Sequence, residues 1–524
     1  MRRFVSRREA MVWLGGLVAV GCGSDAGPSA ETSPSRSPGP AADASVSGAD
    51  ATLGEPRDAG APEDAAPEDA EDAALPKTPE ELLSRIDAIV VVMMENRSFD
   101  HFLGALRSDP NYPAAGGVEG LTGTESNPGP DGGAISAFKM TNFTPEDPPH
   151  SWNASHAQWN NGANDGFVKA HSGATQDEVM GYHDRSQLEF YYFLADHFTV
   201  CDHWFASVMG PTWPNRFYLH ACTSGGKKDN SAYFTGAPTT LWKRLQSAGK
   251  TFKNYAAGAV TWYTGAFIGE ILNLNPSKPI AEFFTDAKNG TLPNFSIIDP
   301  DFFAADDHPS HDIRLGQVFV SSVYRALTES PQWKRTLLVI TYDEHGGFFD
   351  HVPPPTTEDD HVDLGFDQMG FRIPVVVVGP WVKPGVCNTT FDNTSWLKLV
   401  CERFGIEPWT ARIAAATSLA EVLDAERMAA GQPYAPAEVP VVDVDDEAVP
   451  DECLGGGLGP TAPPASGSRR RGTPVHVQNQ EELQAFIRAH MPEHDHTDTV
   501  PARMARLRGW LRERQRGARG ATGG

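Results

Sequence analysis

Three stretches of the chain are apolar almost without interruption, and each stops abruptly. They are Ala88–Met94, Thr336–Tyr342 and residues 373–378. Continuous runs of β-branched and apolar residues of this length are typical of strands that are buried on both faces of a mainly parallel sheet. We therefore expect these segments to be central strands of one sheet.

Helical patterns separate these strands. Candidate helices cover residues 187–196, 240–248, 311–327 and 395–404, and a short earlier helix should begin after Thr78, which can form a capping box with Glu81. Alternating strands and helices predict an α/β fold with helices on both faces of the sheet. In such sheets, ligands bind at the carboxyl ends of the strands.

The two ends of the chain have a different composition. Residues 23–77 are rich in Ala, Pro, Asp and Glu and are expected to form a disordered linker, because they cannot bury enough apolar surface to fold. Residues 432–524 form a low-complexity tail with a short helical stretch and a basic end. One large folded domain is thus expected over residues 78–431.

Residues 1–22 have the charged and apolar regions of an export signal. The adjacent Arg7 and Arg8 resemble a twin-arginine signal, and the apolar run that follows is too short to span a membrane. Cys22 lies where a lipoprotein would carry its lipid anchor, although ordinary cleavage fits the small residues there equally well. We expect an exported protein that is periplasmic, lipid-anchored at the cell surface or secreted.

The net charge and the cysteine content limit the classes of function that this chain can have. The formal net charge of -25 argues against nucleic-acid binding. Beyond Cys22 the chain has five cysteines and no CxxC pair, which disfavours a thiolate metal site. Disulfides between Cys201 and Cys222 or between Cys387 and Cys401 are possible in an exported protein, and buried free thiols are the alternative.

Polar pairs follow two of the predicted strands. Glu95 and Asn96 come directly after the first strand, and Asp343 and Glu344 after the second. Each pair alone is typical of a solvated strand end, but parallel strands would bring both to one edge, where three carboxylates repel each other unless a cation is present. Oxygen ligands favour Ca²⁺, Mg²⁺ or Mn²⁺, and nearby histidines keep Zn²⁺ open.

The segment Gly-Pro-Thr-Trp-Pro-Asn-Arg at residues 210–216 contains a threonine hydroxyl. Its Gly-Pro pair interrupts regular structure just before a predicted helix. Thr212 would lie near the N-terminus of this helix, where backbone amides favour an anionic group and a metal ion lowers the pKa of the hydroxyl. A plain N-cap threonine is the alternative.

Several histidines stand in polar surroundings. The candidates for general acid–base catalysis or for contacts with phosphoryl oxygens are His150, Asp307, His308 and His351. A structural, hydrogen-bonded histidine is the alternative at each position.

Taken together, these segments resemble the bacterial phospholipase C and acid phosphatase family. The resemblance covers roughly residues 86–408 and rests on the Glu95–His101 segment, on residues 210–216 and on Thr-Tyr-Asp-Glu-His-Gly-Gly-Phe-Phe-Asp-His-Val-Pro-Pro-Pro at residues 341–355. One departure is Asn393, where the family commonly has His, so that a contact near the site is either retained or lost.

This resemblance implies an alkaline-phosphatase-like α/β fold: a three-layer sandwich with a mainly parallel central sheet. It implies one divalent metal ion bound by Glu95, Asn96, Asp343, Glu344 and Thr212, with Thr212 as the nucleophile. It also implies that His150, Asp307 and His308 surround the phosphoryl or leaving group, with His351 as a further candidate.

The expected activity is hydrolysis of phosphate esters through a phosphothreonine intermediate, with phosphodiesters such as phospholipids as the preferred substrates. Phosphomonoesters are one alternative, and an inactive metal-binding surface lipoprotein is another. Four tryptophans are candidates for an aromatic cage around a choline headgroup, although core packing is the favoured interpretation for most of them: Trp152, Trp159, Trp204 and Trp213.

Overall fold

The computed structural model describes residues 78–258, 261–271, 273–302, 304–435, 439–444 and 475–477, together with positions 483 and 485. The contacts divide the chain into two units, Met1–Ala74 and Leu75–Gly524, and all described residues belong to the second. The predicted export signal, Cys22 and the linker therefore lie outside the described residues.

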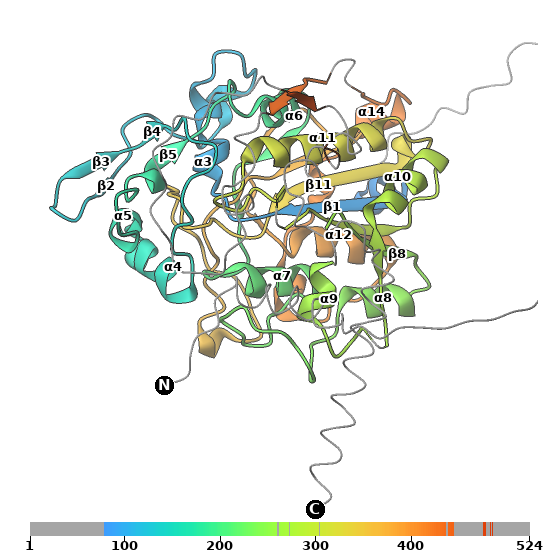
Figure 1. Ribbon diagram of the computed structural model, residues 1–524. Coiled ribbons are helices and arrows are strands. Elements are labelled where there is room, and N and C mark those ends of the chain that lie inside the picture. The colour runs from blue at the N-terminus through green and yellow to red at the C-terminus, as the bar shows by residue number, and fades with distance from the viewer. Residues whose placement is uncertain are drawn as a thin grey trace, which may run out of the picture. The chain divides into compact units, whose positions relative to one another are not determined.

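An eight-stranded sheet forms the centre of the described part (Figure 1). Its strand order is β13-β6-β12-β11-β1-β10-β8-β9. In chain order the strands are β1 (Ala88–Met94), β6 (Thr199–Cys201), β8 (Phe252–Ala256), β9 (Ser277–Pro279), β10 (Phe295–Asp299), β11 (Thr336–Tyr342), β12 (Val376–Val378) and β13 (Gly385–Cys387). The first two predicted strands are thus confirmed with the predicted bounds.

The sheet is mainly parallel, as expected. β1 pairs in parallel with β10 on one side and with β11 on the other. The exception is β12, which runs antiparallel to both β11 and β6. It is also shorter than the predicted strand over residues 373–378, which contains Pro374, a residue without an N–H for the ladder. The carboxyl end of this third strand therefore points away from the edge where β1 and β11 end.

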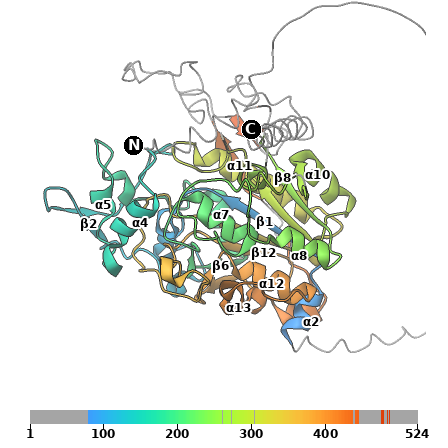
Figure 2. The ribbon, with the colours of Figure 1, turned by 90° about the horizontal axis from the view of Figure 1, so that it is seen from below.

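Helices cover both faces of the sheet (Figures 1 and 2). On one face lie α6 (Glu189–His197), α10 (Ile280–Asn289) and α11 (Ile313–Thr328). On the other lie α7 (Thr212–Ala221), α8 (Leu241–Ser247) and α12 (Ser395–Phe404). All four helices predicted from the pattern are present, with ends within two residues of the prediction.

Ring contacts on β8 and β10 confirm this layering. Phe252 packs on Trp242 of α8, with ring centroids 5.6 Å apart, whereas Tyr255 packs on Phe283 of α10 at 5.5 Å. Side chains alternate between faces along a strand, so positions 252 and 255 face opposite layers. Phe295 of β10 stacks on Trp396 of α12 at 5.4 Å. The expected three-layer arrangement, with a mainly parallel central sheet, is confirmed.

Shorter elements surround these layers. The remaining helices are α2 (Pro79–Ser84), α3 (Phe99–Phe102), α4 (Trp152–Trp159), α5 (Phe167–Ala170), α9 (Trp262–Ala266), α13 (Ala411–Ala415) and α14 (Ala425–Ala429). Small two-stranded sheets pair β2 (Ser126–Pro128) with β3 (Ala134–Ser136), β4 (Phe138–Lys139) with β5 (Gly181–Tyr182), and β7 (Trp204–Phe205) with β14 (Phe391–Asp392). The predicted capping box at the start of α2 is present.

The region expected to be a low-complexity tail also contributes a strand pair. β15 (Val442–Val444) pairs antiparallel with β16 (Val475–Val477). Val442 and Val444 are buried while Asp443 between them is exposed, the alternation of a half-buried strand. The predicted helical stretch at residues 481–490 and the basic end lie almost entirely outside the described residues.

The four described cysteines are free thiols, so neither disulfide considered above is formed. Cys201 and Cys387 instead face each other as register partners of β6 and β13. Cys201, Cys222 and Cys401 are buried and Cys387 is half-buried. None of the described helices is long and apolar enough to cross a membrane.

Candidate active site

The two polar strand ends meet at one edge of the sheet. β1 and β11 pair in register as far as Met94 and Tyr342, their last residues. Directly beyond, the backbone N–H of Asn96 donates to Asp343 Oδ1 at 3.0 Å, and the N–H of Glu344 donates to the same oxygen at 2.8 Å. The carboxylate of Asp343 thus connects both strand ends.

Thr212 lies at this edge as the first residue of α7. The N-cap is Pro211, whose side chain makes no capping hydrogen bond, so the alternative of a plain N-cap threonine is wrong. The Thr212 hydroxyl instead donates to Asn96 Oδ1 at 3.3 Å and is fully buried. The turn before it is braced by Asn215, whose amide donates to the carbonyls of Gly210 and Pro211.

A buried arginine, which the sequence pattern did not single out, compensates the carboxylates. Arg216 is fully buried, and its Nε donates to Asp343 Oδ2 at 3.0 Å. Its Nη2 lies 3.4 Å from Glu95 Oε1, and its Nη1 lies 3.8 Å from Asp299 Oδ1 at the end of β10. Arg216 stands four residues after Thr212, so the two share a face of α7, but this spacing alone does not distinguish it from an ordinary helical arginine.

His150 faces the strand ends from a loop. Its Nε2 lies 3.3 Å from the amide nitrogen of Asn96 and 3.9 Å from Glu344 Oε1. Its Nδ1 lies 2.7 Å from the carbonyl oxygen of Pro148, which fits an Nδ1–H group that donates to this carbonyl. Burial opposes ionisation of Glu344, but the charge of His150 and a hydrogen bond from His345 lower its pKa below the ordinary value.

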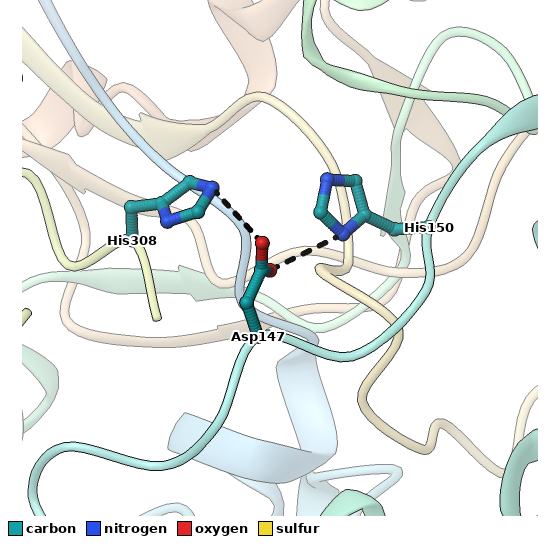
Figure 3. A group of neighbouring side chains, drawn as sticks. All are labelled: Asp147, His150 and His308. Carbon is teal, nitrogen blue, oxygen red and sulfur yellow. Dashed lines mark ion pairs between the residues drawn. The ribbon is translucent and has the colours of Figure 1, made fainter. Parts of the chain in front are cut away.

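Asp147 lies between His150 and His308 (Figure 3). Its Oδ1 is 3.5 Å from His150 Nδ1, and its Oδ2 is 3.9 Å from His308 Nε2. The three side chains could offer ligand atoms to one ion, although His150 is already engaged by Pro148 and Asn96. Asp147 could not be singled out from the sequence, because a half-exposed aspartate in a Pro-rich loop carries no distinctive pattern.

The carboxylate of Asp307 points into the protein core. It is fully buried, and its Oδ2 accepts hydrogen bonds from the hydroxyls of Tyr342 at 2.6 Å and Tyr191 at 3.4 Å. Burial raises the pKa of Asp307 to about 7. No described contact joins this carboxylate to Thr212 or His150, so its position supports the neighbouring loop, whose Asp306 carbonyl accepts the backbone N–H of Glu95 at 2.8 Å.

His351 belongs to a different cluster. Its Nδ1 lies 2.6 Å from Asp100 Oδ2, and Arg372 binds both Asp100, at 3.0 Å, and Asp350, at 2.8 Å. The arginine already compensates these two carboxylates, so this group has the character of a buried ion-pair network rather than of a metal site. The structure does not bring His351 to the other candidate residues.

The side chains at the strand ends include oxygen donors of the kind that a hard divalent cation prefers. Glu95, Asn96, Asp343 and Glu344 are fully buried and offer oxygen donors. One guanidinium, that of Arg216, lies beside the buried carboxylates of Glu95, Asp299 and Asp343, and the buried Glu344 Oε1 accepts no hydrogen bond from any described residue. Such an excess of buried negative charge is costly unless a cation offsets it.

Asn393, at the position where histidine was expected, lies directly behind this edge. Its Oδ1 accepts from Trp204 Nε1 at 3.1 Å, and its Nδ2 lies 3.4 Å and 3.5 Å from the carbonyl oxygens of Tyr342 and Asp343. An asparagine at this position therefore still contacts the end of β11.

The four tryptophans considered for a cage are divided among three apolar clusters, with Trp204 and Trp213 both in the main core. Trp204 packs on Phe391, Trp213 on Trp262, and Trp152 on Phe366. Trp159 belongs with a separate apolar cluster. They do not form one cage around a shared cavity.

Comparisons with known proteins cover the part of the chain that contains this site. A family model described as the phosphoesterase family matches residues 86–407, which include Glu95, Asn96, Thr212, Asp343 and Glu344. A non-specific phospholipase C1 of Arabidopsis thaliana is 39% identical over 341 residues, which cover 59% of this chain and 63% of the plant protein. Phospholipase C B of Mycobacterium tuberculosis is 32% identical over 388 residues, 62% of this chain and 74% of that protein.

Among solved structures, a protein of the alkaline phosphatase superfamily from Vibrio parahaemolyticus overlaps with a TM-score of 0.32 at 11% identity, over 65% of this chain and 79% of the other. The chain spans less than two thirds of the length of its first plant relative. The match to the family model nevertheless covers most of the described domain and confirms the resemblance seen in the sequence. This chain belongs to the phosphoesterase family.

Proposed function

We propose that this protein hydrolyses phosphate esters at the edge of the sheet where β1 and β11 end, with Thr212 as the nucleophile. The observation that carries the proposal is the hydrogen bond from Thr212 Oγ1 to Asn96 Oδ1 at 3.3 Å, within a buried group of carboxylates. A fully buried threonine hydroxyl at a helix N-terminus, beside side chains suited to a cation, is arranged for attack on an anionic substrate.

Glu95, Asn96, Asp343, Glu344 and Thr212 would bind one divalent ion. Such an ion supplies positive charge for phosphoryl oxygens and lowers the pKa of a coordinated hydroxyl. The oxygen donors favour Mg²⁺, Mn²⁺ or Ca²⁺ over Zn²⁺.

In the proposed reaction, Thr212 Oγ loses its proton to water and attacks phosphorus in line with the leaving oxygen. The P–O bond to the leaving group breaks, a phosphothreonine forms, and the departing alkoxide takes up a proton. His308, on the far side of Asp147 from His150, is our candidate for the donor of this proton (Figure 3). Water then attacks phosphorus, the bond from phosphorus to Thr212 Oγ breaks, the phosphate product leaves, and Thr212 Oγ takes up a proton to restore the free hydroxyl. Catalysis in such transfers rests on positioning and charge stabilisation.

We favour phosphodiesters, such as the headgroup linkage of a phospholipid, as substrates. Two relatives that share this part of the chain are named as phospholipases C, which supports the preference. The protein would then act at a lipid surface, and lipidation of Cys22 in an exported form would hold it there.

The substrate preference is tested by hydrolysis of p-nitrophenylphosphorylcholine and of p-nitrophenyl phosphate by the purified protein. A higher kcat/KM for the choline diester supports a phospholipase C activity. A higher value for the monoester would assign the protein as an acid phosphatase. No hydrolysis of either compound with any of the four ions would contradict the proposed function and favour the metal-binding alternative.

A further inference from the structure

Arg216 shares one helix face with the proposed nucleophile. It stands four residues after Thr212 in α7, and side chains at this spacing lie one turn apart on the same face. Both residues are fully buried. The contacts of the guanidinium therefore hold the same turn of helix that carries Thr212.

The guanidinium of Arg216 binds the end of β1 directly. Its Nη2 donates to the carbonyl oxygens of Met93 and Met94 at 3.1 Å each. These are the last two residues of the strand, and Glu95 and Asn96 follow at once. One side chain thus connects the helix that carries Thr212 with the strand that delivers Asn96.

The same guanidinium holds the carboxylate of Asp343 in place. Its Nε donates to Asp343 Oδ2 at 3.0 Å, while Asp343 Oδ1 accepts the N–H groups of Asn96 and Glu344. Because both oxygens of Asp343 accept hydrogen bonds, rotation of the carboxylate is restrained. A planar guanidinium with several donors can make these contacts at once, whereas the ammonium of a lysine is a point charge with different geometry.

We propose that Arg216 is a positioning residue, which sets the placement of Thr212 relative to Asn96 and Asp343 and offsets the charge of the buried carboxylates when no other cation is bound. This inference rests on the proposed function, because it concerns the same site. Arg216 acts through its neighbours, and the loss of its side chain should affect the chemical step more than substrate binding.

The chain offers a matched control. Arg412 is also buried, at 1% exposure, and binds two carboxylates, Asp392 at 2.9 Å and Asp359 at 3.2 Å. It contacts neither Thr212 nor the residues at the ends of β1 and β11 in any described interaction. If Arg216 contributed only to folding, substitution of either arginine should have the same effect on kcat per folded molecule.

The first experiment compares kcat and KM of the wild type with those of Arg216→Met, Arg216→Lys and Arg412→Met, each corrected for the folded fraction. We expect Arg216→Met to lower kcat on the order of 100-fold with little change in KM, since misplacement of reacting groups by about 1 Å costs this much. Arg216→Lys should recover only part of this loss, and Arg412→Met should keep wild-type kcat per folded molecule.

Chemical rescue provides a further comparison. Millimolar guanidinium should raise the kcat of Arg216→Ala and leave the kcat of Arg412→Ala unchanged.

A second readout does not depend on activity. We expect Mn²⁺ to raise the melting temperature of Arg216→Met by more than it raises that of the wild type, because the ion replaces a missing positive charge. For Arg412→Met the increase should equal that of the wild type. Equal kcat losses in the two variants, or equal effects of Mn²⁺ in all three proteins, would overturn the inference. If the wild type hydrolyses neither test substrate, the proposed function fails, and the Mn²⁺ comparison still decides on Arg216.

Discussion

The backbone N–H of Asn96 donates to Asp343 Oδ1 at 3.0 Å, although 247 residues separate the two in sequence. Asn96 has a left-handed backbone with φ of 61°, a conformation that asparagine adopts more readily than most residues. The end of β1 thereby turns its amide toward β11. The proposed site depends on this turn, because Asn96 also accepts the hydroxyl of Thr212.

Gly346 should be essential for the position of Asn96. A Cβ at Gly346 would lie 2.1 Å from the carbonyl oxygen of Asn96, whereas Gly405, with the same φ of 65°, has open space around it. Both Gly346→Ala and Gly405→Ala should lose about 1–2 kcal/mol from the strained backbone. Only Gly346→Ala should also lose kcat. Equal kcat in the two variants would show that Asn96 does not need its present position.

Asp307 predicts a specific pH dependence of stability. Burial raises its pKa to about 7, above the ordinary value of 3.8. Between these values the folded state binds more protons than the unfolded state, so this contribution to stability is complete below about pH 4 and is lost as the pH rises to about 7. Urea unfolding of wild type and Asp307→Asn at several pH values measures it. The variant should gain stability relative to the wild type across this window, and parallel curves would contradict the prediction.

His351 should matter for stability and not for the chemical step. Burial would lower its pKa, but the hydrogen bond and charge of Asp100 raise it above the ordinary value of 6.5. The stabilisation from this pair is therefore present below about pH 6.5 and is lost as the pH rises through the higher folded-state pKa. His351→Gln should be destabilised most in acid, with kcat per folded molecule close to wild type. A loss of kcat as large as that of Thr212→Ala would instead place His351 in the reaction.

Removal of divalent ions should abolish activity without unfolding the domain. Arg216 still offsets part of the negative charge of Glu95, Asp299 and Asp343 after chelation. We expect EDTA to stop hydrolysis and to leave the far-ultraviolet circular dichroism unchanged, and Mg²⁺, Mn²⁺ or Ca²⁺ to restore turnover. Full activity of a protein shown by elemental analysis to be free of metal would contradict metal dependence.

The sequence predicted the parts of this structure that depend on local pattern. The strands ending at Met94 and Tyr342 were recognisable because apolar residues fill nearly every position, a pattern typical of a strand buried on both faces. The direction of β12 was not predictable, because an apolar run does not indicate whether the strand lies parallel or antiparallel to its neighbours. The two strand-end pairs were found because parallel neighbours end at one edge.

Other parts of the site needed the three-dimensional structure. Arg216 looks like an ordinary helical arginine in sequence, and its carboxylate partners come from the ends of three different strands. His351 follows Asp350 in sequence, but its strong partner is Asp100, 251 residues away. The partners of these buried charged groups could therefore not be predicted from residues adjacent in sequence.

The central claim is that Thr212 becomes covalently phosphorylated during turnover. The most direct test mixes the protein with p-nitrophenylphosphorylcholine, stops the reaction with acid and maps the modified peptide by mass spectrometry, with Thr212→Ala as the control. We predict a modification on Thr212 that is absent from the variant, and loss of turnover in the variant with little loss of Mn²⁺ binding. An unmodified Thr212 during steady turnover, together with near-normal activity of Thr212→Ala, would contradict the proposed mechanism.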